Sequence, residues 1–103
     1  MTTASGSHSF RVATSHPCLP GHFPGHPTVP GVLILDHVIA CVLDAADDQE
    51  RVAGLPQVKF LMPLQPEQEA RIEWNRDGMR VRFRVLDADA RLLASGELKV
   101  NAA

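Results

Sequence analysis

The sequence predicts an α+β domain in which an antiparallel sheet wraps around one helix. A single apolar run, residues 31–46, is too long for a typical strand and is typical of a helix. One segment of alternating apolar and polar residues precedes this run, and four follow it. Such alternation is typical of half-buried strands. The length of 103 residues favours one domain over residues 1–103, with a core so thin that a deep ligand tunnel would need a second subunit.

The chain before the helix divides into three parts. Residues 1–7 are Thr, Ser, Ala and Gly apart from Met1, and we expect them to be frayed and disordered. Residues 8–14 alternate, with Phe10 and Val12 on one face, and predict a strand. Residues 16–30 hold five of the eight prolines, so neither a helix nor a strand can run through them. A long, stiff loop in so small a domain is often functional.

The helix is predicted from Gly31 to Ala46. Pro30 suits the start of a helix, because proline fixes φ and its missing N–H is not needed there. Apolar side chains cover almost the whole circumference, which predicts a helix buried on all sides. The acidic residues that follow indicate that the chain after the helix is exposed to solvent.

Four strands are predicted after the helix. They fall near residues 52–62, 70–74, 81–85 and 92–100, with turns at 75–78 and 87–90. Val58, Phe60 and Met62 share one face of the first of these strands. Because the strands follow one another with short connections, we expect them to form a meander.

Composition narrows the class of protein. Ten Lys and Arg against 12 Asp and Glu give a net charge of −2, which argues against general nucleic-acid binding. No apolar run reaches the roughly 18 residues of a membrane span, and the first residues lack the pattern of a secretory signal. Cys18 and Cys41 are too few for a disulfide framework. We therefore expect a cytoplasmic protein with reduced thiols and no membrane partner.

Asp36 and His37 interrupt the apolar helix. A carboxylate on such a helix must be paired, exposed at an interface, or protonated. It could sit at an edge and bond a loop backbone group, or it could serve as a general acid. The sequence leaves both interpretations open.

The proline-rich loop supplies further candidates. His16, Cys18, His22 and His26 could bind zinc, but the interleaved prolines and the lack of a Cys-x-x-Cys pair argue against it. His16 and His26 fit surface loop histidines well, whereas the role of His22 stays open.

The start of the helix offers an anion-stabilising group. Its first backbone N–H groups have no partner within the helix, and Gly31 has no side chain to obstruct an approaching carbonyl oxygen. A base, an oxyanion donor and an acid are the groups that an elimination next to a carbonyl requires.

Residues 21–36, Gly-His-Phe-Pro-Gly-His-Pro-Thr-Val-Pro-Gly-Val-Leu-Ile-Leu-Asp, resemble the signature of the (3R)-hydroxyacyl-[acyl carrier protein] dehydratases of the FabZ/FabA type, which have the hotdog fold. Residues 58–66 are similar to the Lys-Phe strand and Pro-x-x-Pro turn of the same family. The resemblance implies that His22 is the base and that Asp36, 14 positions later, is its acidic partner. It also implies that the Gly31 amide holds the substrate carbonyl, with Phe23, Pro30 and Val32 beside the substrate.

The resemblance further implies a hydro-lyase of fatty-acid or polyene-type biosynthesis that acts on 3-hydroxyacyl groups carried by acyl carrier protein. It implies a homodimer, or an assembly of dimers, whose active site takes the histidine and the acid from opposite subunits. It implies no metal and no redox cofactor, since the phosphopantetheine arm belongs to the substrate. Arg80, Arg82 and Arg84 line one strand face and could dock the acidic carrier, although such a stripe is more often the solvated face of a sheet.

Two positions depart from the family pattern. Ala40 stands where the family often carries glutamine, and Glu67 stands where its turn has glycine. A hotdog acyl-thioesterase and a non-catalytic acyl-binding hotdog subunit therefore remain as alternatives. Acyl chain length, pathway and any accompanying isomerase activity stay open.

Overall fold

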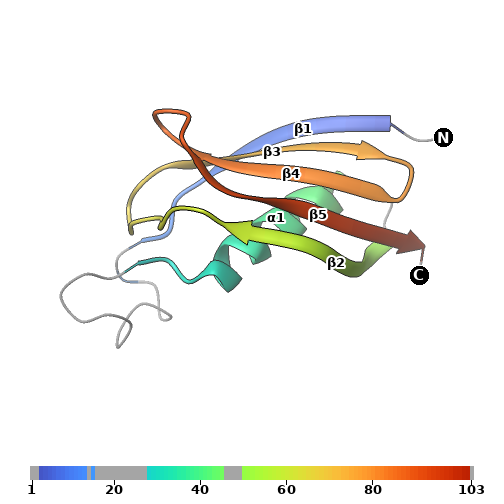
Figure 1. Cartoon of the computed structure of the whole chain (residues 1–103), viewed down its shortest axis with the longest axis horizontal. Coiled ribbons are helices and arrows are strands. Elements are labelled where there is room, and N and C mark those ends of the chain that lie inside the picture. The colour runs from blue at the N-terminus through green and yellow to red at the C-terminus, as the bar shows by residue number, and fades with distance from the viewer. Residues whose placement is uncertain (1–2, 14, 16–27, 46–49, 103) are drawn as a thin grey trace.

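A computed structural model describes residues 3–13, 15, 28–45 and 50–102. The elements are β1 (Thr3–Phe10), α1 (Gly31–Asp44), β2 (Glu50–Phe60), β3 (Ala70–Asp77), β4 (Arg80–Asp87) and β5 (Leu92–Ala102). The strands form one five-stranded antiparallel sheet, and α1 lies across one of its faces (Figure 1). The predicted α+β class is confirmed, and α1 begins where the sequence predicted.

The strand order is β1-β3-β4-β5-β2, so the expected meander holds only for β3, β4 and β5. The expectation that β2 continues into this meander is wrong, because β2 pairs with β5 and forms the far edge of the sheet. The connection from β2 to β3 spans residues 61–69, long enough to cross the end of the sheet. The N–H groups of Leu61 and Met62 both donate to the carbonyl of Leu93, which fixes the start of this crossing beside β5.

Strand β1 forms the other edge and begins at Thr3. The expectation of fraying is therefore wrong for residues 3–7. The pairing with β3 runs without a break from Thr3 opposite Asp77 to Phe10 opposite Ala70. A full ladder of backbone hydrogen bonds orders a segment whose small polar residues give little local preference for a strand. The strand stops at Phe10 because its partner begins at Ala70, and residues 11–13 do not continue it as predicted, whereas Thr14 lies outside the described residues.

The core lies between the sheet and α1. Alternate residues of β3 and β4 point into it, as the apolar–polar alternation predicted. Its buried side chains include Ile34, Val38, Val42, Ile72, Trp74, Val81, Phe83, Val85, Ala94, Leu98 and Val100.

Only one side of α1 is covered by the sheet. Ile34, Val38 and Val42 are the buried residues of the helix, so the expectation of a helix buried on all sides is wrong for the single chain. A single sheet can cover only one face of a helix that crosses it. On the opposite side, Val32 is 63% exposed, and Asp36, Ala40 and Asp44 follow it at intervals of four residues and are exposed too. We call these four residues the outer stripe of α1. No helix among the described residues is long and apolar enough to cross a membrane.

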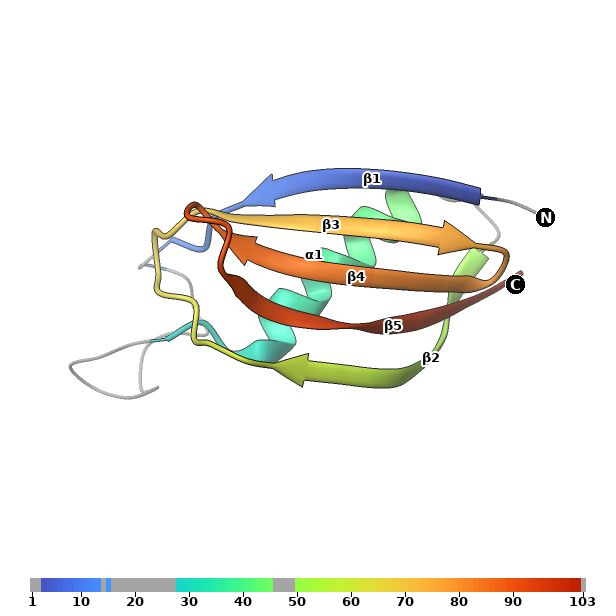
Figure 2. The same cartoon turned by 45° about the horizontal axis from the view of Figure 1, so that its top comes forward.

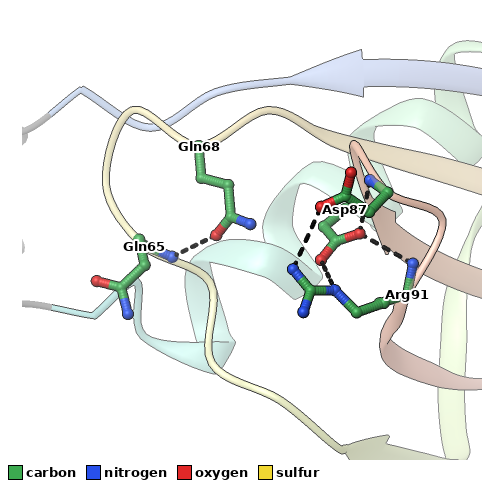
Figure 3. Close-up of polar contacts among 5 residues, drawn as sticks. Gln65, Gln68, Asp87 and Arg91 are labelled. Carbon is green, nitrogen blue, oxygen red and sulfur yellow. Dashed lines mark hydrogen bonds and ion pairs between the residues drawn. The ribbon is translucent and has the colours of Figure 1, made fainter.

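The segment 61–69 holds the end of the sheet together. Leu64 is fully buried, and its carbonyl accepts a hydrogen bond from the N–H of Val29 at 2.8 Å. The N–H of Glu67 donates to the carbonyl of Val12, also at 2.8 Å. The N–H of Gln65 bonds the side chain of Gln68 within the same segment (Figure 3). Val12, before the proline-rich loop, and Val29, near its end, are therefore tied to one segment.

The predicted turn between β4 and β5 is built around a buried carboxylate. Asp87 Oδ1 accepts hydrogen bonds from the N–H groups of Asp89 and Arg91, both at 2.9 Å, and Oδ2 accepts one from Arg91 Nε at 3.0 Å (Figure 3). The backbone N–H of Arg91 is the main reason that the pKa of Asp87 is lowered below its usual value. The turn lies at the same end of the sheet as the start of α1 (Figure 2).

Candidate active site

The start of α1 presents unpaired backbone donors. Pro30 has an extended backbone, and its carbonyl accepts the N–H groups of Leu33 and Ile34 at 3.0 and 3.4 Å. No side chain caps the helix, and within the described residues no acceptor bonds the N–H of Gly31 or Val32. The first turn carries no acidic residue that would neutralise the positive end of the helix dipole. This end of the helix can therefore stabilise an oxygen that gains negative charge, as the sequence predicted for Gly31.

A hollow of about 570 Å³ opens beside these donors. It is lined by Val29, Gly31, Val32, Ile34, Phe60, Leu61, Met62, Pro63 and Leu64. The lining side chains are apolar, which suits an acyl chain better than a polar ligand. The predicted substrate contact Val32 lines the hollow, whereas the predicted contact Pro30 is not among its lining residues.

Asp36 lies one helical turn after Val32 on the outer stripe. It is exposed in the single chain, at a surface that another molecule can cover. The adjacent His37 turns toward the sheet, and its ring stacks on that of Phe10 with centroids 4.3 Å apart and planes 14° apart. The two polar residues that interrupt the helix thus have different environments.

The predicted base His22 and the predicted substrate contact Phe23 lie outside the described residues. The alternative zinc ligands His16, Cys18 and His26 lie outside them as well. Among the residues that the structure does describe, no group of three or more His, Cys, Asp and Glu side chains could hold a metal ion. The structure brings together Gly31, Val32 and Asp36 from the predicted site.

The arginine stripe lies on the face of the sheet opposite α1. Arg80 and Arg82 pair with Glu97 at 3.4 and 3.6 Å, and Arg84 pairs with Glu73 at 2.6 Å. All three guanidinium groups remain largely exposed, which matches the solvated sheet face named as the alternative. Lys59, Arg71 and Lys99 add further cations to this outer face, against Glu73, Asp77 and Glu97.

Three apolar residues of the hollow were missed by the sequence reasoning. Phe60, Leu61 and Met62 are each between two-fifths and just over half exposed, although they are large and apolar. The alternation along the strand placed Phe60 on a face with Val58, but no local signal shows that this face meets the start of α1. That contact arises from the pairing of β2 with β5, which is non-local.

One helix across a five-stranded antiparallel sheet is the architecture of hotdog-fold proteins, and solved structures place this chain in that class. The dehydratase heterocomplex ApeI:P from Xenorhabdus doucetiae matches with a TM-score of 0.83 at 23% identity, covering 93% of this chain and 86% of that chain. An acyl-CoA hydrolase from Staphylococcus aureus matches with a TM-score of 0.68 at 19% identity, covering 95% and 62%. At these identities the likeness shows the fold alone, and it confirms the predicted hotdog fold.

The family is shown by the sequence. The family model for ApeI-like proteins, described as ApeI dehydratase, matches residues 2–97, so the chain belongs to this dehydratase family. It is similar to the 3-hydroxyacyl-[acyl-carrier-protein] dehydratase FabZ of Aliarcobacter butzleri, with 34% identity over 104 residues that cover 85% of this chain and 71% of the relative. FabZ of Geobacter metallireducens is 39% identical over 71 residues, which cover 60% of this chain and 47% of that relative. The resemblance to FabZ-type dehydratases is confirmed.

Proposed function

We propose that the protein dehydrates 3-hydroxyacyl thioesters on acyl carrier protein to trans-2-enoyl thioesters. The observation that carries the proposal is the pair of N–H groups of Gly31 and Val32, which no acceptor bonds within the described part of the chain. They lie at the mouth of an apolar hollow, with the Asp36 carboxylate one turn after Val32 along the helix. Membership of a dehydratase family supports the reaction class. An apolar hollow suits the acyl chain, and the helix start suits the thioester carbonyl.

The reaction needs three roles, and the chain has a residue for each. The Gly31 N–H donates to the thioester oxygen, which gains negative charge when the C2 proton leaves. His22 accepts that proton, and the electron pair of the C2–H bond becomes the C2–C3 double bond. Asp36 donates a proton to the C3 hydroxyl, which departs as water with the electrons of its C–O bond. The step is redox-neutral, so its electron balance requires no oxidant or reductant.

A homodimer would complete this site. The outer stripe of α1, with Asp36 on it, is exposed, and its first residue, Val32, lines one hollow with the exposed side chains of Phe60, Leu61 and Met62. A contiguous apolar surface of this kind marks an interface. A second copy of the chain would cover the stripe, enclose the acyl group and place its own loop histidine beside Asp36.

The decisive experiment incubates the protein with 3-hydroxyacyl thioesters and follows the products by mass. Dehydration lowers the mass of the acyl group by one water and leaves the thioester intact. A thioesterase would release a free thiol and a carboxylic acid instead, and a non-catalytic acyl-binding subunit would change neither. Release of thiol, or no reaction with carrier-bound and small thioesters alike, contradicts the proposal.

The same assay identifies the catalytic pair. We expect His22→Ala to lower turnover by a factor on the order of 10² or more, because the proton acceptor is lost. Asp36→Asn should be equally damaging, since it removes the acid and keeps the shape. His16→Gln and His26→Gln are the matched controls, and either of them abolishing activity while His22→Ala does not would reassign the base.

Docking of the carrier on the outer face of the sheet is a separate part of the proposal. The outer face carries more cations than anions while the whole chain is net negative, which favours an acidic partner there. Arg82→Glu should then raise KM for the carrier-bound substrate and leave kcat/KM for a small thioester unchanged. Arg11→Glu, an exposed arginine outside this strand, is the control. An equal effect of Arg82→Glu on both substrates would contradict docking at this face.

A further inference from the structure

The ring of Phe60 rests on the first residue of α1. A Cβ atom built on Gly31 would lie 2.7 Å from Cζ of Phe60, 2.9 Å from Cε1 and 3.0 Å from Cε2. Carbon atoms in van der Waals contact are about 3.5–4.0 Å apart, so any side chain at position 31 would collide with the ring. Gly31 is therefore the residue type that allows the ring to lie at the helix start.

The backbone of Phe60 is firmly placed, although its ring is 51% exposed. Phe60 is the last residue of β2 and is paired with Ala94 of β5. The next two N–H groups along the chain, those of Leu61 and Met62, bond the carbonyl of Leu93. The end of β2 is thus held beside the start of α1, as Figure 2 shows, and one side of the ring stays open toward the hollow.

We propose that Phe60 is a substrate-positioning residue, and that its ring forms the wall against which the thioester rests while its oxygen accepts the Gly31 N–H. This inference rests on the proposed function and adds a residue to its site. The argument is geometric, because a group bonded to the amide of residue 31 lies beside whatever packs on that residue. The ring also keeps water from the thioester, which strengthens a hydrogen bond to a developing oxyanion.

The proposal gives Gly31 two roles, one through its N–H group and one through its lack of a side chain. Gly31→Ala keeps the N–H group but pushes the ring away from the helix start. If the ring positions the thioester, the loss of activity in Gly31→Ala comes from the displaced ring. Removing the ring by Phe60→Ala should then leave little for the alanine at position 31 to disturb.

A double-mutant cycle in kcat/KM for a small 3-hydroxyacyl thioester tests this coupling. We expect each of Phe60→Ala and Gly31→Ala to lower kcat/KM about tenfold or more, mainly through kcat, because a displacement of about 1 Å can cost up to about 10²-fold. The double variant should lose about as much as the worse single variant, not the product of the two losses. Phe60→Tyr keeps the ring and should retain activity within about threefold. Met79→Ala, which truncates a 56% exposed side chain in the opposite hairpin, is the matched control and should behave as wild type.

Losses that multiply in the double variant would overturn the proposal, as would a Phe60→Ala variant within twofold of wild type. Thermal unfolding of the wild type, the two single variants and the double variant forms a second cycle, which measures the effect of the substitutions on packing separately from their effect on activity. If the wild type lacks dehydratase activity, the proposed function fails and the positioning role fails with it. The unfolding cycle would then still show whether the ring and a side chain at residue 31 compete for one space, so the two failures can be told apart.

Discussion

Two hairpin turns each place one residue in the left-handed region of the backbone. Gly78 lies at φ 61° between β3 and β4, and Ala90 lies at φ 63° between β4 and β5. Glycine adopts this conformation without steric cost, whereas alanine brings its Cβ close to the following carbonyl. The turn between β3 and β4 therefore has the favoured residue, glycine, whereas the turn between β4 and β5 has alanine in the same conformation.

Replacing alanine by glycine in one turn and glycine by alanine in the other should change the free energy of unfolding in opposite directions. We expect Ala90→Gly to raise the free energy of unfolding by about 1 kcal/mol and Gly78→Ala to lower it by about as much. A Cβ at position 78 would meet no atom within 4 Å, so the second effect is purely a backbone effect. Urea unfolding measures both, and a Gly78→Ala variant as stable as wild type would contradict the backbone argument.

Asp87 should make the stability of the fold depend on pH in the acid range. The backbone N–H of Arg91, first among several donors, lowers the pKa of the folded-state carboxyl below the value of about 3.9 in an unfolded chain. The stabilisation by the ionised group is therefore present above pH 4 and is lost as the pH falls through the lowered folded-state pKa.

The variant Asp87→Asn should unfold more easily than wild type at neutral pH. Because the benefit belongs to the ionised form, the difference between the two proteins should shrink as the pH is lowered below about 4. Urea titrations at several pH values measure this difference, with Asp77→Asn in the opposite hairpin as the control. A difference that stays constant down to pH 2 would show that the hydrogen-bonded carboxylate is not its origin.

At the scale of the elements, the edge strand β2 depends on a glycine in its neighbour. The register between β2 and β5 shifts twice, between Val52 and Gly54 and between Gly54 and Gln57. A Cβ on Gly96 of β5 would lie 2.4 Å from the carbonyl oxygen of Gln57, a backbone atom that cannot rotate away. The irregular stretch of β2 can therefore approach β5 only because residue 96 has no side chain.

Gly96→Ala should accordingly loosen β2. We expect a loss of about 1–3 kcal/mol in the free energy of unfolding, the usual range for overpacking, and faster amide exchange along β2. Gly54→Ala is the matched control, since a Cβ there would meet nothing within 4 Å and should change stability by less than about 0.5 kcal/mol. Equal effects of the two substitutions would refute the steric explanation.

The elements that the sequence predicted well are those whose pattern is local. The start of α1 at Gly31 follows from Pro30 and the apolar run, and β3 and β4 follow from strict alternation. The predicted turn at 75–78 is wrong for residues 75–77, because β3 stays paired with β4 as far as Asp77 opposite Arg80. The start of β1 and the place of β2 could not be predicted, because both depend on pairing with strands far along the chain. The same reason hid Phe60, whose contact with Gly31 exists only once β2 lies beside β5. Gly31 and Asp36 were found from the sequence as the first residue of the helix and as a carboxylate that interrupts its apolar run, and the family signature carries both. The exposure of Asp36 became visible only in the folded chain.

At the scale of the whole molecule, the site should be shared between subunits. The outer stripe of α1 with Asp36 is open in the single chain, and we propose that a second copy closes it. Mixing inactive His22→Ala with inactive Asp36→Asn should then restore activity when subunits exchange. A random mixture gives about half heterodimers with one intact pair each, so roughly a quarter of wild-type activity should return.

Subunit exchange must be verified in the same sample, for example by capture of an untagged variant with a tagged one. Self-mixed preparations of each variant serve as the controls for residual activity. Verified exchange without recovery would place both residues in one subunit, or would remove one of them from the site.

The two hydrogen bonds that tie the segment 61–69 to Val12 and Val29 form a frame around the proline-rich stretch. Both bonds join backbone atoms, the N–H of Glu67 to the carbonyl of Val12 and the N–H of Val29 to the carbonyl of Leu64. A side-chain substitution between the two anchor points therefore removes neither the donor nor the acceptor of either bond. Anchors made by backbone atoms allow the residues between them to change while the fold is kept, in line with the general rule that function resides in sites carried by a fold.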